Sequence, residues 1–267
     1  NTTLASLIDT SFNNIYQLIL GKYFSLSQTG LFFQARKLQE VPIGVIKSST
    51  FSVVFSALSK VQSDPKLFTK LYNRIITLFT VFVALICLLV FFYSKDIILM
   101  LYGEKWVESV FYLQILIVTS FFFMQEMFNR LIFKVFDQTH KILHLEYFKK
   151  TIQAISIVIG VIMMDVKILL FGFLVTSVIS FFLNYYVSRR VQNNFVWYEF
   201  FLVIKVIMIS IVTVLLGLFI KKNCGLTDFY SFFLLPVLIG VFLVLIKLFR
   251  VSDIIKDVRT VLITIRK

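Results

Sequence analysis

Long apolar stretches recur along the chain, and they constrain its fold more than any other feature. An α-helix needs roughly 18 to 25 apolar residues to cross the hydrocarbon layer of a bilayer, which is about 30 Å thick. The 267 residues are 59% hydrophobic, and 32 of them are Phe. A water-soluble domain of this length could not bury so much apolar surface. The sequence therefore predicts an all-α, polytopic membrane protein.

The apolar stretches predict about eight transmembrane helices and a short tail. The spans are expected near residues 4–20, 31–57, 75–93, 108–131, 149–165, 168–188, 200–220 and 229–249. Together they make one predicted transmembrane domain, residues 1–250. In residues 251–267 apolar side chains recur at helical spacing between basic ones, which favours an amphipathic helix on the cytoplasmic membrane surface. A frayed tail without fixed structure is the alternative.

The basic residues are distributed unevenly between the connections. The net charge is +13, which in a soluble protein would suggest nucleic acid. Here most Lys and Arg fall in alternate connections, for example Lys60 to Arg74, Arg130 to Lys150, and Lys247 to Lys267. By the positive-inside rule these connections are cytoplasmic. We therefore expect both ends of the chain at the cytoplasmic face, membrane lipids as neighbours and no nucleic-acid partner.

Polar residues form a stripe along the first predicted span. They recur at steps of three and four, which places them on one face of a helix: Ser6, Asp9, Asn13, Tyr16 and Gln17, with Asn14 beside them. Such a stripe either lines an aqueous path or packs against another helix through hydrogen bonds. Both interpretations stay open, and the ionisable Asp9 strengthens the first of them.

The second predicted span carries more charge than the first. Its polar face is formed by Arg36, Glu40, Gly44 and Lys47, with Lys37 beside it. Arg36 and Glu40 are four residues apart and can pair along the helix, but that pair leaves Lys37 and Lys47 uncompensated. Pro42 removes a backbone hydrogen bond about midway. The pattern favours a kinked, cationic helix that faces an anion.

A further polar cluster, Glu126, Asn129 and Arg130, lies near the end of the fourth predicted span. Arg130 is favoured there as an anchor at the cytoplasmic interface, with a role in binding as the weaker alternative. His140 and His144 are four residues apart, but no carboxylate or cysteine follows at a spacing typical of metal ligands. They are expected to be solvated histidines, and no metal site is predicted.

No motif for soluble catalysis is found in the sequence. The connections are short, about 3 to 20 residues, and they contain no Gly-rich phosphate loop and no pattern of a catalytic triad. We expect no catalytic residue and no cofactor. Any chemistry of recognition should take place between the helices.

Four segments carry a family resemblance. They are IDTSFNNIYQLILGKYFS (Ile8 to Ser25), TGLFFQARKLQEVP (Thr29 to Pro42), VVFSALSKVQSDP (Val53 to Pro65) and YGEKW (Tyr102 to Trp106). In order and spacing they resemble the C-terminal half of bacterial polysaccharide-biosynthesis exporters over about residues 5–150. These exporters are the Wzx-type flippases for lipid-linked oligosaccharides, related to the multidrug MATE transporters and the lipid II flippase.

The resemblance implies two lobes of helices around a central cleft in the bacterial inner membrane, with both termini cytoplasmic. The N-terminal lobe would be absent from this chain, and the first two helices of this chain would line the cleft. The implied cargo is an undecaprenyl diphosphate-linked glycan for O-antigen, capsule or exopolysaccharide synthesis. Glycan polymerases and glycosyltransferases of the same pathway are the implied partners.

The polar stripes then acquire expected roles. Arg36, Lys37 and Lys47 are expected to contact diphosphate or acidic sugars, and Asn13, Asn14 and Gln17 to bind sugar hydroxyls. Asp9 and Glu40 are candidates for coupling to Na⁺ or H⁺. A MATE-like antiporter of cationic drugs is the alternative, and a membrane-embedded glycan polymerase is a weaker one. More cations than carboxylates in the stripes favour an anionic cargo.

Overall fold

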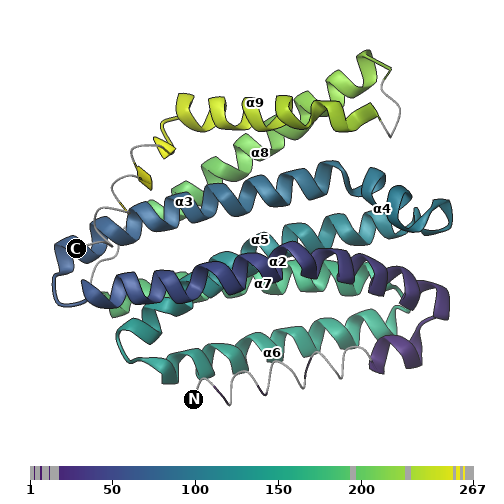
Figure 1. Ribbon diagram of the computed structural model, residues 1–267. Helices are drawn as coiled ribbons and strands as arrows, with labels where there is room; N and C mark the ends of the chain where they lie inside the picture. Colours follow the sequence, from purple (N-terminus) through teal and green to yellow (C-terminus); the bar gives the residue numbers. More distant parts are fainter. Residues whose placement is uncertain are drawn as a thin grey trace. The chain divides into compact units, whose positions relative to one another are not determined.

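A computed structural model describes residues 3, 7, 12, 18–192, 197–225, 230–254, 257–258 and 261 of the chain. Long α-helices dominate this part, and no strand occurs in it. The elements are α2 (Leu26–Lys60), α3 (Pro65–Phe92), α4 (Ser94–Tyr102), η1 (Glu104–Trp106), α5 (Ser109–Val135), α6 (Thr139–Ile162), α7 (Val166–Val191), α8 (Tyr198–Asn223), η2 (Tyr230–Leu234) and α9 (Leu235–Leu248). Figure 1 shows their course.

Six of these helices are long and apolar enough to cross a membrane. They are α2, α3, α5, α7, α8 and the η2–α9 segment from Ser231 to Leu248. The prediction of a polytopic all-α membrane protein is therefore confirmed, whereas the count of eight is not. The first predicted span lies largely outside the described residues, and α6 carries too many charged residues to qualify.

The boundary of α6 corrects the sequence prediction. The span was expected to begin at residue 149, yet the helix begins at Thr139 and ends at Ile162. Hydropathy detects only its apolar second half, from Ile155 onward. The first half is polar in sequence, but one of its faces is buried in the protein, and Glu146, Lys149 and Lys150 on that face are each less than a tenth exposed. Lys149 and Lys150 therefore belong to the buried face of a helix and not to a solvated connection.

Two local structures follow from short stretches of the sequence. Asp64 caps α3, because its side chain accepts hydrogen bonds from the backbone amides of Lys66 and Leu67 at 3.0 Å each, and Pro65 occupies the first helical position. The segment after α3 forms the short helix α4, which ends at Tyr102 with Gly103 as its C-cap. Pro42 does not end the helix: α2 continues through it as one helix of 35 residues.

The chain divides into two compact units. Unit 1 comprises residues 1–51 and 108–195, and unit 2 comprises residues 52–107 and 196–267. In unit 1, α7 packs against both α5 and α6. The contact with α6 is close, since a Cβ added to Gly172 would overlap the side chain of Ser156. Ser188 of α7 also donates a hydrogen bond to Asn129 of α5 at 2.8 Å.

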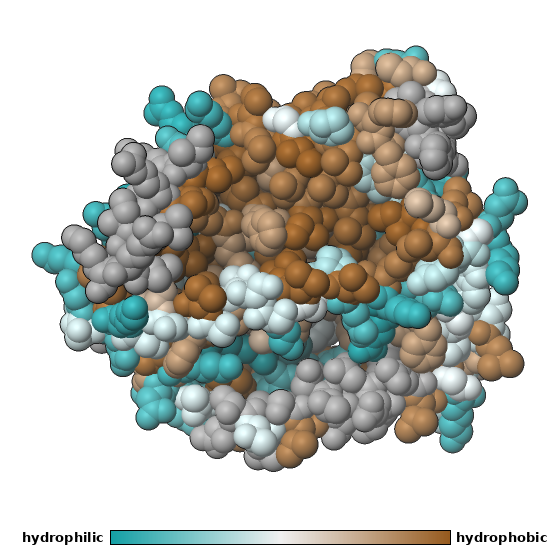
Figure 2. Space-filling view, in the orientation of Figure 1, coloured by the Kyte–Doolittle hydropathy of each residue, from teal (hydrophilic) through white to brown (hydrophobic). Residues whose placement is uncertain are grey.

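Unit 2 packs α8 against α3 and α9. A side chain at Gly217 of α8 would collide with Leu238 and Phe92, so this close approach requires glycine. Many large apolar side chains of α8 are exposed, among them Phe201, Met208, Leu215 and Phe219. Figure 2 shows a continuous apolar surface over α3, α8 and α9, with hydrophilic residues gathered towards the helix ends. This distribution suits contact with lipid.

Candidate anion-binding cavity

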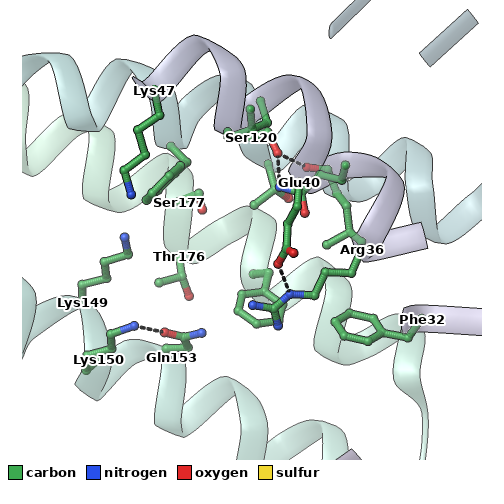
Figure 3. Close-up of a pocket in the computed structure, with 17 residues that line it drawn as sticks. Phe32, Arg36, Glu40, Lys47, Ser120, Lys149, Lys150, Gln153, Thr176 and Ser177 are labelled. Carbon is green, nitrogen blue, oxygen red and sulfur yellow. Dashed lines mark hydrogen bonds and ion pairs between the residues drawn. The ribbon is translucent and has the colours of Figure 1, made fainter. Parts of the chain in front are cut away.

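A cavity of about 390 Å³ lies within unit 1, between α2, α5, α6 and α7 (Figure 3). Its lining consists of Phe32, Arg36, Gln39, Glu40, Ile43, Gly44, Lys47, Leu116, Thr119, Ser120, Phe123, Lys149, Lys150, Gln153, Phe173, Thr176 and Ser177. Aromatic rings and polar side chains therefore line one space. This mixture is typical of sites that hold an amphipathic ligand in a defined orientation.

The polar face predicted for the second span lines this cavity. Arg36, Glu40, Gly44 and Lys47 all contribute to its wall, as their helical spacing indicates. The Arg36 Nε lies 2.9 Å from a Glu40 carboxylate oxygen, so the expected pair along the helix is present. Lys37 instead lines a neighbouring hollow with Phe33, Gln34, Arg36 and Glu40. The structure thus places Lys47 in the cavity and Lys37 outside it.

Two further cations enter the cavity from α6. Lys149 and Lys150 line it from the side opposite α2, and Figure 3 shows the amino groups of Lys47 and Lys149 directed into the same space. The Lys150 amino group donates a hydrogen bond to the side-chain oxygen of Gln153 at 3.2 Å. It also lies 5.2 Å from the centre of the Phe12 ring. The sequence prediction missed both lysines because it counted them, at the very start of the predicted span, with the basic residues of the preceding cytoplasmic connection.

Behind the two lysines lies a network of buried charges between α5 and α6. Lys149 donates to the two carboxylate oxygens of Glu126 at 3.0 and 3.2 Å. Arg130 bonds to both Glu126 and Glu146, and Lys150 lies 3.7 Å from Glu146. Glu126 is completely buried and Glu146 almost so. Each carboxylate therefore has two cationic neighbours, which is the condition under which buried charge is tolerated.

The network changes the interpretation of Glu126 and Arg130. They pair four residues apart, as the spacing indicates, but the Arg130 side chain is only 12% exposed. Burial at this level differs from an anchor that reaches the membrane surface, which was the favoured role. Neither residue lines the cavity; they contact it through Lys149. Asn129 of the same cluster bonds to Ser188 and holds α5 against α7.

The electrostatic balance of the cavity is positive. Four cationic side chains line it, namely Arg36, Lys47, Lys149 and Lys150, and Glu40 is the one carboxylate in its lining. Adding Arg130, Glu126 and Glu146 behind the wall still leaves five cations and three carboxylates. Within the described residues Lys47 has no carboxylate partner. Such a site attracts anions, and the low-dielectric wall strengthens the attraction.

Neutral hydrogen-bonding groups complete the lining. The Gln39 side chain donates to the hydroxyl of Ser120 at 2.6 Å, which joins α2 to α5 at the cavity wall. Thr119, Gln153, Thr176 and Ser177 add hydroxyl and amide groups. Groups of this kind can bond to the hydroxyls of a sugar. The cavity therefore combines charge for an anion with donors and acceptors for a polar, uncharged part.

Four of the predicted site residues and the histidine pair remain to be considered. Asp9, Asn13, Asn14 and Gln17 fall outside the described residues, so their expected roles stay predictions. The rings of His140 and His144 are 6.4 Å apart and edge to face. Within the described part of the chain, no group of three or more His, Cys, Asp and Glu could hold a metal ion.

Comparison with known proteins bears on this cavity. Residues 1–111 match the family described as polysaccharide biosynthesis protein, a range that contains all of the α2 wall. The resemblance to a Wzx-type exporter is thereby confirmed over that range. Neither the curated proteins nor the solved structures yield a match. The match covers 111 of the 267 residues and supports a role in polysaccharide biosynthesis. The six long apolar helices support a multi-pass membrane protein.

Proposed function

We propose that this chain is the cargo-binding, C-terminal part of a flippase for a lipid-linked oligosaccharide. The observation that carries the proposal is the cationic cavity between α2 and α6. A diphosphate between lipid and sugar carries negative charge, which Arg36, Lys47, Lys149 and Lys150 can neutralise. The hydroxyl and amide groups of the same lining can bond to the first sugars. The family match supports a role in polysaccharide biosynthesis, and the positive charge of the cavity supports an anionic cargo.

Movement of such a cargo requires access from each membrane face in turn. Many transporters achieve this by rocking two lobes about a site near the membrane midplane. The cavity would lie in one lobe, and a second lobe of helices would complete the cleft. The proposal includes the bacterial inner membrane as the location, and the basic connections favour both chain ends at its cytoplasmic face. Coupling to Na⁺ or H⁺, with Asp9 and Glu40 as candidate carriers, belongs to the same proposal.

The two alternatives are less consistent with the cavity. An antiporter of cationic drugs needs carboxylates to attract its cargo, whereas the lining has four cations and one carboxylate. A glycan polymerase needs a catalytic acid or base placed at a reacting bond. Glu40 is the carboxylate in the lining, and it already pairs with Arg36. We therefore propose transport without catalysis, supplied and followed by the glycosyltransferases and polymerase of the pathway.

Removal of cavity cations from the full-length protein tests this function. We expect Arg36→Ala combined with Lys47→Ala to lower glycan export at least tenfold, because two of the four cations that would hold the diphosphate are lost. Export is measured as surface polysaccharide in a strain without the native gene, at equal protein abundance. Lys37→Ala, which lies outside the cavity, should have a smaller effect.

A matched control uses Lys222, an exposed lysine at the end of α8. Lys222→Ala removes one cationic charge without touching the cavity and should leave export unchanged. Normal export by the Arg36, Lys47 double variant would overturn the assignment of the cavity to cargo binding.

A further inference from the structure

Lys149 stands between two possible partners. One is the Glu126 carboxylate, to which its amino group donates at 3.0 and 3.2 Å. The other is whatever occupies the cavity, since Lys149 belongs to its lining and points into it (Figure 3). Its amino group also lies 5.1 Å from the centre of the Phe123 ring, which is part of the same wall. An anion in the cavity would therefore compete with Glu126 for this lysine.

Such competition is possible only if Glu126 can release the lysine. A buried carboxylate that loses its only cation is strongly destabilised. Glu126, however, is also bonded to Arg130, which bonds to Glu146 as well. Arg130 presents several donors in a fixed planar arrangement and can keep both carboxylates paired. Glu126 would thus retain a cation after Lys149 had turned away.

A cation on the opposite wall of the cavity favours movement of Lys149 towards a bound anion. Lys47 on α2 points into the cavity from the other side and has no carboxylate partner among the described residues. Two ammonium groups that face one space repel each other. An anion placed between them would be attracted to both and would relieve that repulsion. Glu126 provides the compensating charge for Lys149 while no anion is present.

We propose that Glu126 is a resident counter-ion, and that Lys149 exchanges its bond to Glu126 for a bond to a phosphate oxygen of the cargo. The inference rests on the proposed function, since it assigns a step to the same cavity. Glu126 does not touch the cargo and acts as a positioning residue through Lys149. By competing for Lys149, Glu126 weakens cargo binding and speeds cargo release. Each export cycle needs cargo binding and cargo release.

Binding of inorganic diphosphate to the purified full-length protein tests the exchange, measured by titration calorimetry. We expect E126Q to lower the Kd by about tenfold, because the amide keeps the shape of the side chain but holds the lysine weakly. In the K149M background the same substitution should change the Kd by less than about twofold. E40Q removes a carboxylate that does not contact Lys149, so its effect should be equal in both backgrounds.

Transport gives a second measurement that a merely structural role would not reproduce. With an undecaprenyl diphosphate-linked disaccharide in proteoliposomes, E126Q should lower both the apparent KM and the maximal rate, because cargo binds more tightly and leaves more slowly. A loss of stability alone would lower the rate without lowering KM. If E126Q fails to fold, E126D tests the same point, since its shorter side chain should still lower the Kd.

The outcomes separate the two proposals. If the wild-type protein binds diphosphate and E126Q leaves the Kd unchanged, or lowers it equally in the K149M background, the exchange is wrong and the cavity assignment stands. If the wild-type protein does not bind diphosphate at all, the proposed cargo class is wrong and the exchange falls with it.

Discussion

The two units of the chain treat charge differently. In unit 1 five charged side chains form one connected network, in which Arg130 bonds to both Glu126 and Glu146. In unit 2 the described charges occur as separate contacts: Lys221 lies 3.3 Å from Asp96, and Tyr72 donates to Glu199 at 3.0 Å. The network borders a cationic cavity, whereas the separate contacts join helices. A shared network lets one member leave without stranding another, which an isolated pair does not allow.

The largest expected effect comes from the centre of the network. Arg130→Met should destabilise the protein by about 3–5 kcal/mol, because Glu126 and Glu146 lose the cation that they share and both are buried. The measurement is the unfolding midpoint of purified protein in detergent. Arg190→Met, an exposed arginine on α7, is the control and should have little effect. Similar midpoints for the two variants would show that the network contributes no stability.

The Lys221–Asp96 pair of unit 2 should be less sensitive. Lys221→Met should destabilise the protein by about 1–3 kcal/mol, since one buried carboxylate, Asp96, loses this cation. Asp96 also lies in the first turn of α4, where the helix dipole favours a carboxylate. The neighbouring, exposed Lys222→Met serves as the control in the same unfolding assay. A larger loss for Lys221→Met than for Arg130→Met would reverse the comparison between the units.

Loss of the hydrogen bond between Tyr72 and Glu199 in unit 2 should destabilise the protein less. Tyr72→Phe removes the hydroxyl that bonds to Glu199 and should lower stability by about 1 kcal/mol. Tyr72 is fully buried, so Tyr147→Phe on the exposed face of α6 provides a matched control without burial. Equal unfolding midpoints for wild type and Tyr72→Phe would show that this bond has no net effect.

The smallest effect is expected at the edge of the cavity. Glu40→Gln breaks the pair with Arg36, but the Glu40 side chain is 60% exposed, so stability should change by about 0.5 kcal/mol or less. Diphosphate binding should nevertheless become tighter, because Arg36 is released and the cavity becomes more positive. A combined measurement of unfolding and binding therefore separates a role in recognition from a role in stability. Weaker binding would contradict the cationic interpretation of the cavity.

Sequence reasoning succeeded where one helix carries the whole pattern. The face of Arg36, Glu40, Gly44 and Lys47 follows from helical spacing alone, and the structure places all four in one wall. The cap at Asp64 is equally local. Sequence reasoning failed at α6, because the hydropathy around Lys149 and Lys150 resembles that of a basic loop. The missed signal was Glu146, Lys150 and Gln153 at steps of four and three, which fits a buried helical face.

The sequence by itself determined the class of fold, the cationic face of α2 and the family resemblance, because hydropathy, helical period and motif order are properties of contiguous residues. The tertiary structure decided which helices the cationic face of α2 lies against. It brought Lys149 and Lys150 from more than a hundred residues away, and it placed Glu126 and Glu146 behind them as counter-ions. The energy of a buried charge depends on its neighbours in space, and helical spacing within one segment does not specify those neighbours.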